Sequence, residues 1–190
     1  TAVGARAAHP AQGLLAMDPV IVTAGADAAA GRGELALALT CALFADLLTR
    51  VPTAARYVGA VVATGAPITF DHGALRTIDG PTGALPRGIQ AFARILEPLG
   101  YRIGGIYPLP RLAMTGKAFV HCDFPEAIPQ FFVSELHVAE FAAPARAAAT
   151  RVFGTSRDPL GPAEREALAL LAENGRCPRA VALAARTPWG

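Results

Sequence analysis

A histidine and an arginine lie four residues apart in a segment that alternates like a β-strand. Residues 68–78 would place Phe70, His72, Ala74 and Arg76 on one face and Asp71, Gly73, Leu75 and Thr77 on the other. A neutral imidazole suits a catalytic metal, and a guanidinium group can hold a carboxylate through two parallel hydrogen bonds. The pattern therefore predicts that His72 binds a metal and that Arg76 binds a small acid on the same wall of a site.

A second expected strand, residues 130–138, also has one face with ionisable groups. Its two faces consist of Phe131, Val133, Glu135 and His137 and of Phe132, Ser134, Leu136 and Val138. If the polar faces of both strands line one concave sheet, His72 and Glu135 can converge on a metal. A carboxylate among apolar neighbours needs such a partner, because an unpaired buried charge is costly.

Each of these residues also has a structural interpretation, which the sequence leaves open. A lone histidine in a strand is more often structural than a metal ligand. The alternative ion-pair partners are Asp79 or Glu97 for Arg76, and Arg102 or Lys117 for Glu135. His121 and His137 have weaker support as ligands, and we expect His121 to be solvated at the end of a strand.

The elements that must position these side chains follow from apolar periodicity and from prolines and glycines. We expect helices at residues 34–49, 52–65, 86–99, 162–174 and 179–186, and strands at 68–78, 102–107, 117–124 and 130–138. Between residues 68 and 138 the order is β-α-β-β-β, which predicts an α+β fold with a curved mixed sheet of about four strands. We expect helix 86–99 on the convex face, and the opposite face with Phe131 and Val133 to need a cover.

The remaining segments and the composition of the chain limit the domain number and the class of protein. Residues 1–33 form a weakly patterned arm, for which the sequence leaves open a flexible state or irregular packing across the body. Residues 34–190 are expected to form one domain in which 142–161 is a linker. The basic residues are scattered and the net charge is +2, which argues against nucleic acid. No apolar run reaches the roughly 18 residues that a membrane helix needs, and no signal peptide is evident. Three distant cysteines indicate neither disulfides nor structural zinc, so we expect a cytoplasmic protein.

Three short motifs make the chain resemble a known family. The segments Asp71-His72-Gly73-Ala74-Leu75-Arg76-Thr77, Leu99-Gly100-Tyr101 and Phe132-Val133-Ser134-Glu135-Leu136 resemble the 2-oxoadipate dioxygenase/decarboxylases. That family belongs to the vicinal oxygen chelate superfamily, whose modules have the order β-α-β-β-β. The resemblance covers roughly residues 40 to 190 and involves only the N-terminal module of the family.

The resemblance implies an iron(II) oxidoreductase of lysine degradation, which converts 2-oxoadipate and dioxygen to D-2-hydroxyglutarate and carbon dioxide. His72 would match the first metal histidine of the family, and Arg76 would match the arginine that holds a substrate carboxylate. The family takes its remaining histidine and glutamate from a second, C-terminal module, so Glu135 is only a substitute candidate. We expect the chain to be the first part of a longer enzyme or a naturally short relative that has lost catalysis. Its open sheet face would be covered by helices 34–65 and 162–186, by another copy of the chain, or by a missing second module. The alternatives are a non-catalytic module that binds small molecules and a glyoxalase-type metal-dependent lyase or isomerase.

Overall fold

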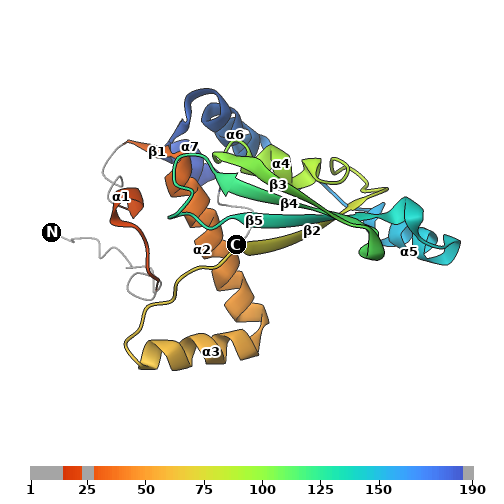
Figure 1. Cartoon of the computed structure of the whole chain (residues 1–190). Coiled ribbons are helices and arrows are strands. Elements are labelled where there is room, and N and C mark those ends of the chain that lie inside the picture. Colours follow the sequence, from red (N-terminus) through yellow and green to blue (C-terminus); the bar gives the residue numbers. More distant parts are fainter. Residues whose placement is uncertain (1–14, 23–27, 186–190) are drawn as a thin grey trace.

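The computed structural model describes residues 15–22 and 28–185 (Figure 1). Its helices are α1 (Pro19–Val22), α2 (Arg32–Arg50), α3 (Pro52–Ala63), α4 (Gln90–Leu96), α5 (Ala143–Phe153), α6 (Pro162–Asn174) and α7 (Arg179–Ala184), with short 3-10 turns η2 (Pro110–Leu112) and η3 (Val138–Glu140). Its strands are β1 (Ala29–Gly31), β2 (Gly73–Asp79), β3 (Tyr101–Leu109), β4 (Met114–His121), β5 (Phe131–His137) and β6 (Arg176–Pro178).

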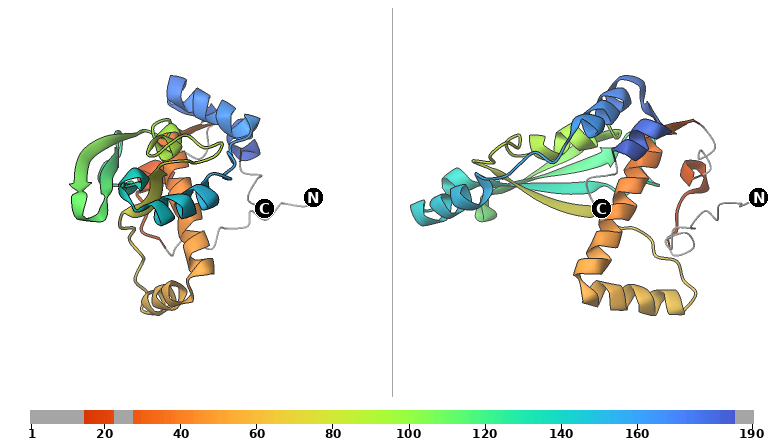
Figure 2. Two further views of the ribbon diagram at one scale, coloured as in Figure 1. Left: turned by 90° about the vertical axis from the view of Figure 1, so that its right-hand side faces the viewer. Right: turned by 180° about the vertical axis from the view of Figure 1, so that it is seen from behind.

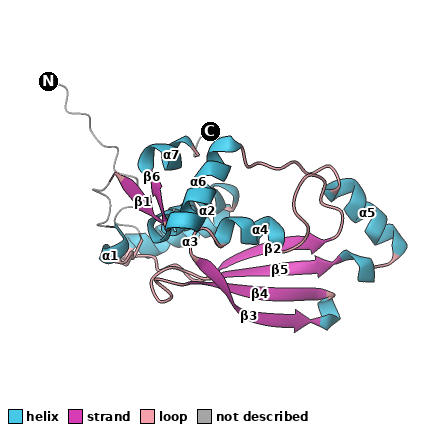
Figure 3. Cartoon of the chain, turned by 90° about the horizontal axis from the view of Figure 1, so that it is seen from above, coloured by secondary structure: helices cyan, strands magenta, loops and turns pink. Residues whose placement is uncertain are grey.

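The centre of the fold is a four-stranded mixed sheet in the order β2-β5-β4-β3, seen from above in Figure 3. β2 pairs with β5 in parallel, whereas β4 pairs antiparallel with both β5 and β3. A parallel pair needs a long crossover, and here α4, β3 and β4 together provide it. The expected α+β fold and the β-α-β-β-β order are both confirmed.

The strand register decides which side chains share a face of the sheet. Leu75 of β2 lies opposite Val133 of β5, and Gly73 lies opposite Phe131. Leu75 therefore shares the face of Phe131 and Val133, while Ala74 and Arg76 share the face of Phe132 and Ser134. The expectation that the His72 and Glu135 faces line one concavity is wrong, because it assigned the two faces of the last strand the wrong way round.

The Phe131 face is the buried face of the sheet. Phe131 and Val133 are at most 1% exposed and pack with Ala93 and Leu96 of α4. Residues of α2 and α6, including Ala36 and Leu171, complete this core, and Figure 1 shows α4 and α6 on this side of the sheet. The expected cover over the patch is thus supplied by the chain's own helices, and α4 lies on this face and not on the opposite one.

Both ends of the described chain pack against this body. β1 pairs antiparallel with β6, which brings Ala30 opposite Cys177 in the core. Ile21 of α1 is buried as well, so the described parts of residues 1–33 pack against the body, which is one of the two arrangements left open by the sequence. Residues 1–14 and 23–27 lie outside the described residues. Residues 142–161 are also more ordered than a linker, because they contain α5.

The helices α2 and α3 lead away from the sheet, as the rear view in Figure 2 shows. No single helix among residues 15–22 and 28–185 is long and apolar enough to cross a membrane. Only α2 and α3 together pass that test of length and composition, and they are bent by 112° where they meet.

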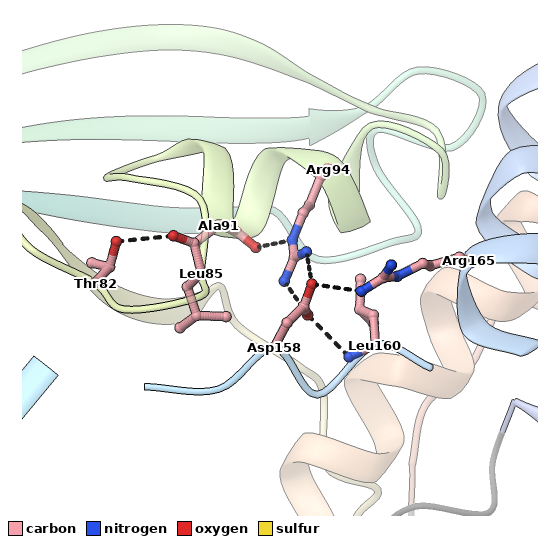
Figure 4. A network of polar contacts seen from close by, with 7 residues as sticks. All are labelled: Thr82, Leu85, Ala91, Arg94, Asp158, Leu160 and Arg165. Carbon is pink, nitrogen blue, oxygen red and sulfur yellow. Dashed lines mark hydrogen bonds and ion pairs between the residues drawn. The ribbon is translucent and has the colours of Figure 1, made fainter. Parts of the chain in front are cut away.

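A compact polar network ties α4 to the segment between α5 and α6 (Figure 4). Both terminal nitrogens of Arg94 donate to the Asp158 carboxylate at 2.8 Å, and Arg165 donates to it at 3.0 Å. The backbone N–H of Leu160 donates to the same carboxylate at 3.0 Å. These bonds hold the pKa of Asp158 far below its ordinary value, and the hydrogen bonds from Arg94 contribute most.

Candidate functional site

His72 lies directly before β2, and its ring is oriented by its neighbour in the chain. The side chain is 47% exposed, and its Nδ1 lies 3.1 Å from Oδ1 of Asp71. The backbone N–H of His72 donates to the same oxygen at 2.8 Å, and this bond is the main reason that the pKa of Asp71 is lowered. With Nδ1–H donating to Asp71, the Nε2 lone pair of His72 is available to a metal.

Arg76 lies in the middle of β2 on the face opposite the core. Its Nε donates to Oγ of Ser134 at 3.2 Å, because the register places Ser134 directly beside it on β5. Ser134 is itself buried and donates a 3.4 Å hydrogen bond to the carbonyl of Leu75. Ser134 therefore orients Arg76, a role that sequence reasoning missed although the residue stands in one of the recognised motifs. Arg76 forms this bond in place of the ion pairs considered from sequence.

Two pockets meet at His72. One has a volume of about 550 Å³ and is lined by His72, Asp71 and the turn from Pro125 to Gln130. The other, of about 490 Å³, lies between the same segment and the C-terminal half of α2. A small organic acid would fit either pocket by size. The residues around His72 thus offer space for a ligand, although Arg76 lines neither pocket.

Glu135 does not join His72. It lies on the core side of β5 opposite Thr77, five positions along β2 from His72. Its Oε2 accepts a hydrogen bond of 2.5 Å from the backbone N–H of Ile89, which precedes the first turn of α4. This bond satisfies a donor at the helix start, so Glu135 has a structural role there in place of the cross-strand pairs with Arg102 or Lys117.

Glu135 instead lies in a group with Asp79 and His137. Each of the three residues offers one ligand atom, these atoms lie within 4.8 Å of one another, and all three residues are partly buried. Such a group could hold a metal ion. It lies at the end of β2 farthest from His72. No group of three such side chains that includes His72 is found in residues 15–22 and 28–185.

His121 is a structural residue and not a solvated one. It is 1% exposed, its Nε2 lies 3.0 Å from the carbonyl of Leu99, and its Nδ1 accepts from the N–H groups of Asp123 and Phe124. This arrangement requires the neutral Nε2–H tautomer. Desolvation lowers the pKa of His121 despite the nearby carboxylate of Asp123, so the ring stays neutral at physiological pH.

Comparison with solved structures identifies several proteins of similar fold. A protein from Ralstonia eutropha JMP134 assigned to the glyoxalase superfamily is 44% identical over 94% of this chain, with a TM-score of 0.86. The hydroxyglutarate synthase of Oryza sativa, solved with 2-oxoadipate, is 20% identical over 75% of the chain, with a TM-score of 0.55. The protein YdcJ of Shigella flexneri, which includes the domain DUF1338, is 18% identical over 80% of the chain, with a TM-score of 0.59.

The chain therefore shares its fold with a protein assigned to the glyoxalase superfamily. The chain spans only 56%, 46% and 44% of the lengths of these three proteins. No protein-family model matches the chain, and no curated protein does.

Proposed function

We propose that this chain is one module of an iron(II)-dependent enzyme that acts on a small 2-oxo dicarboxylic acid, with 2-oxoadipate as the first candidate and dioxygen as co-substrate. The proposal rests on one observation, which is that the segments Asp71–Thr77 and Phe132–Leu136 lie side by side in the sheet. Arg76 of the first motif is oriented by Ser134 of the last, while His72 directly precedes the strand that carries Arg76. The 2-oxoadipate complex of the rice synthase, which has the same fold, supports the choice of substrate.

His72 fits the role of a metal ligand by the chemistry of its ring. Asp71 accepts from Nδ1 and fixes the tautomer, as the carboxylates behind metal-binding histidines do. Nε2 of His72 would hold iron(II), which supplies a Lewis acid that binds a 2-oxo acid and admits dioxygen. The half-exposed ring leaves this nitrogen accessible from the pockets beside it.

Arg76 would hold a carboxylate of the substrate. Its Nε is engaged with Ser134, so the two terminal nitrogens remain to form a forked pair with a carboxylate. The bond to Ser134 fixes the plane of the guanidinium, which lowers the entropy lost when the acid binds. Lysine cannot reproduce this planar fork.

A catalytic metal site usually has about three protein ligands, and His72 supplies one. The remaining ligands would come from a second module, as the family resemblance implies, or from a second copy of the chain. A second candidate function follows from the same observation: with one ligand in place, the module could bind a small acid beside His72 without turning it over. Calorimetry and oxygen uptake on the same sample separate these two functions.

The test measures 2-oxoadipate binding by calorimetry and oxygen uptake with added iron(II), on the gene product that carries this chain. Arg76→Met should weaken 2-oxoadipate binding about ten- to a hundredfold, because a charge-assisted pair contributes roughly 1.5–3 kcal/mol. Arg76→Lys should restore little of it, and Arg111→Met, an exposed arginine in η2, is the matched control. His72→Ala should abolish iron-dependent uptake. Unchanged binding in Arg76→Met, or unchanged uptake in His72→Ala, would refute the proposal.

A further inference from the structure

We propose that Asp79, Glu135 and His137 bind a divalent transition-metal ion, at a site separate from His72 and independent of the function proposed above. Strand register brings the three together: Asp79 lies directly opposite His137 at the ends of the parallel pair β2 and β5. Glu135 is two positions before His137 and so points to the same side of the sheet. Two carboxylates and an imidazole therefore converge where both strands end.

Each of the three side chains has one atom held by an outer partner. The outer bonds run from Arg87 Nε to Asp79 Oδ1 at 2.5 Å, from Ile89 N–H to Glu135 Oε2 at 2.5 Å, and between Thr115 Oγ1 and His137 Nε2 at 2.9 Å. Bonds of this kind orient ligands in metal sites, because they fix the rotamer and the tautomer before the ion arrives. They leave Oδ2 of Asp79, Nδ1 of His137 and the second oxygen of Glu135 for an ion.

The spacing of these atoms suits a shared ion better than a direct bond. Nδ1 of His137 lies 3.7 Å from Oδ2 of Asp79, which is too long for a hydrogen bond. Two ligands that each lie about 2.1 Å from one ion are roughly 3–4 Å apart. The side chains of His137 and Asp79 are 25% and 37% exposed, so an ion can reach the site from solvent.

The donor set indicates the class of ion. Two carboxylates carry two negative charges, and the guanidinium of Arg87 balances only one of them. One nitrogen and two carboxylate ligands favour zinc, cobalt(II), manganese or iron(II) over calcium, which prefers an all-oxygen shell. A bound ion would tie the ends of β2 and β5 to the start of α4, since Glu135 contacts both the site and Ile89.

Cobalt(II) is a suitable probe because its visible absorbance reports the ligand geometry. The purified chain is stripped with chelator and titrated with cobalt(II), with calorimetry for stoichiometry and a thermal melt with and without metal. His137→Gln can keep the bond to Thr115 through its amide while it removes the Nδ1 ligand. Asp79→Asn can keep an acceptor for Arg87 while it removes the charge. Glu173→Gln is the control, because it removes an exposed carboxylate of α6 that does not belong to this group.

We expect the wild type and Glu173→Gln to bind one cobalt(II) per chain at this site and to melt at a higher temperature with metal. His137→Gln and Asp79→Asn should bind at least about tenfold more weakly. The metal-free melting temperatures of the two variants report whether they fold. The proposal is overturned if the wild type takes up no cobalt(II) at millimolar concentration, or if folded His137→Gln and Asp79→Asn bind as the wild type does. It is also overturned if a separate His72→Ala variant loses the metal while His137→Gln and Asp79→Asn keep it, a result that would leave the function proposed for His72 standing.

Discussion

Replacement of Asp158 by asparagine should destabilise the protein through one identifiable pair. The carboxylate receives two parallel hydrogen bonds from Arg94, and the two side chains are 17% and 24% exposed, so solvent screens the pair only weakly. Asparagine keeps an oxygen that can accept from Leu160, but it turns an NH₂ group toward a guanidinium. Loss of a charge-assisted pair costs about 2–3 kcal/mol, which lowers the melting temperature of a domain of this size by about 5–10 °C.

Arg94 and Arg165 offer a matched comparison of the same chemistry in two environments. Arg165 is 62% exposed and gives Asp158 a single hydrogen bond, so Arg165→Gln should cost less than about 1 kcal/mol. Arg94→Gln should cost about as much as Asp158→Asn. Urea unfolding of the single and double variants gives the coupling energy between Arg94 and Asp158, which we expect to exceed about 1 kcal/mol.

The pH dependence gives this prediction a second measurement. The pKa of Asp158 in the folded protein lies well below its ordinary value of 3.8. A depressed pKa means that the stabilisation is fully present above the ordinary value and is lost as the pH falls toward the folded-state value. The stability difference between wild type and Asp158→Asn should therefore be constant above about pH 5 and shrink below about pH 4. Equal costs for Arg94→Gln and Arg165→Gln, or a coupling near zero, would refute the reasoning.

Two further predictions concern residues that hold the sheet and α4 in place. Because desolvation lowers the pKa of His121 below 6.5, its contribution to stability should be full above about pH 7 and decline as the pH falls below 6.5, by up to about 1.4 kcal/mol per pH unit. His121→Gln should lack this decline in urea unfolding at pH 7.5 and 5.5, and an identical slope in both proteins would contradict the assignment. Glu135→Ala should cost about 1 kcal/mol, because the N–H of Ile89 loses its acceptor. Hydrogen exchange should show the loss concentrated in α4, and unaltered exchange there would contradict the capping role.

The helices and strands of this fold could be predicted where apolar residues recur at regular spacing or where a proline or glycine marks the end of a helix. Residues 162–174 begin with a proline and end before Gly175 in a left-handed conformation, and α6 has these bounds. α5 differs from the expected linker because its sequence is mostly alanine, which favours helices strongly but gives no distinct apolar face, and none of its residues is buried.

The faces of the last strand could not be assigned from its own sequence. Phe131 and Val133 on one side and Phe132 and Leu136 on the other are about equally apolar, so the composition does not distinguish them. Only the pairing with β2 decides which side meets α4. For the same reason Glu135 was grouped with His72, whereas three-dimensional pairing groups it with Asp79 and His137.

The parallel pairing of β2 with β5 also sets an order of assembly. Arg76 and Ser134 are neighbours across the sheet but lie 58 positions apart in the chain. β3, β4 and β5 follow one another directly and close much shorter loops, so we expect them to associate first. β2 then joins the free edge of β5 in the later part of folding. The strand that carries Arg76 would accordingly be protected late in refolding, and the hydrogen bond between Arg76 and Ser134 would form only with that final docking.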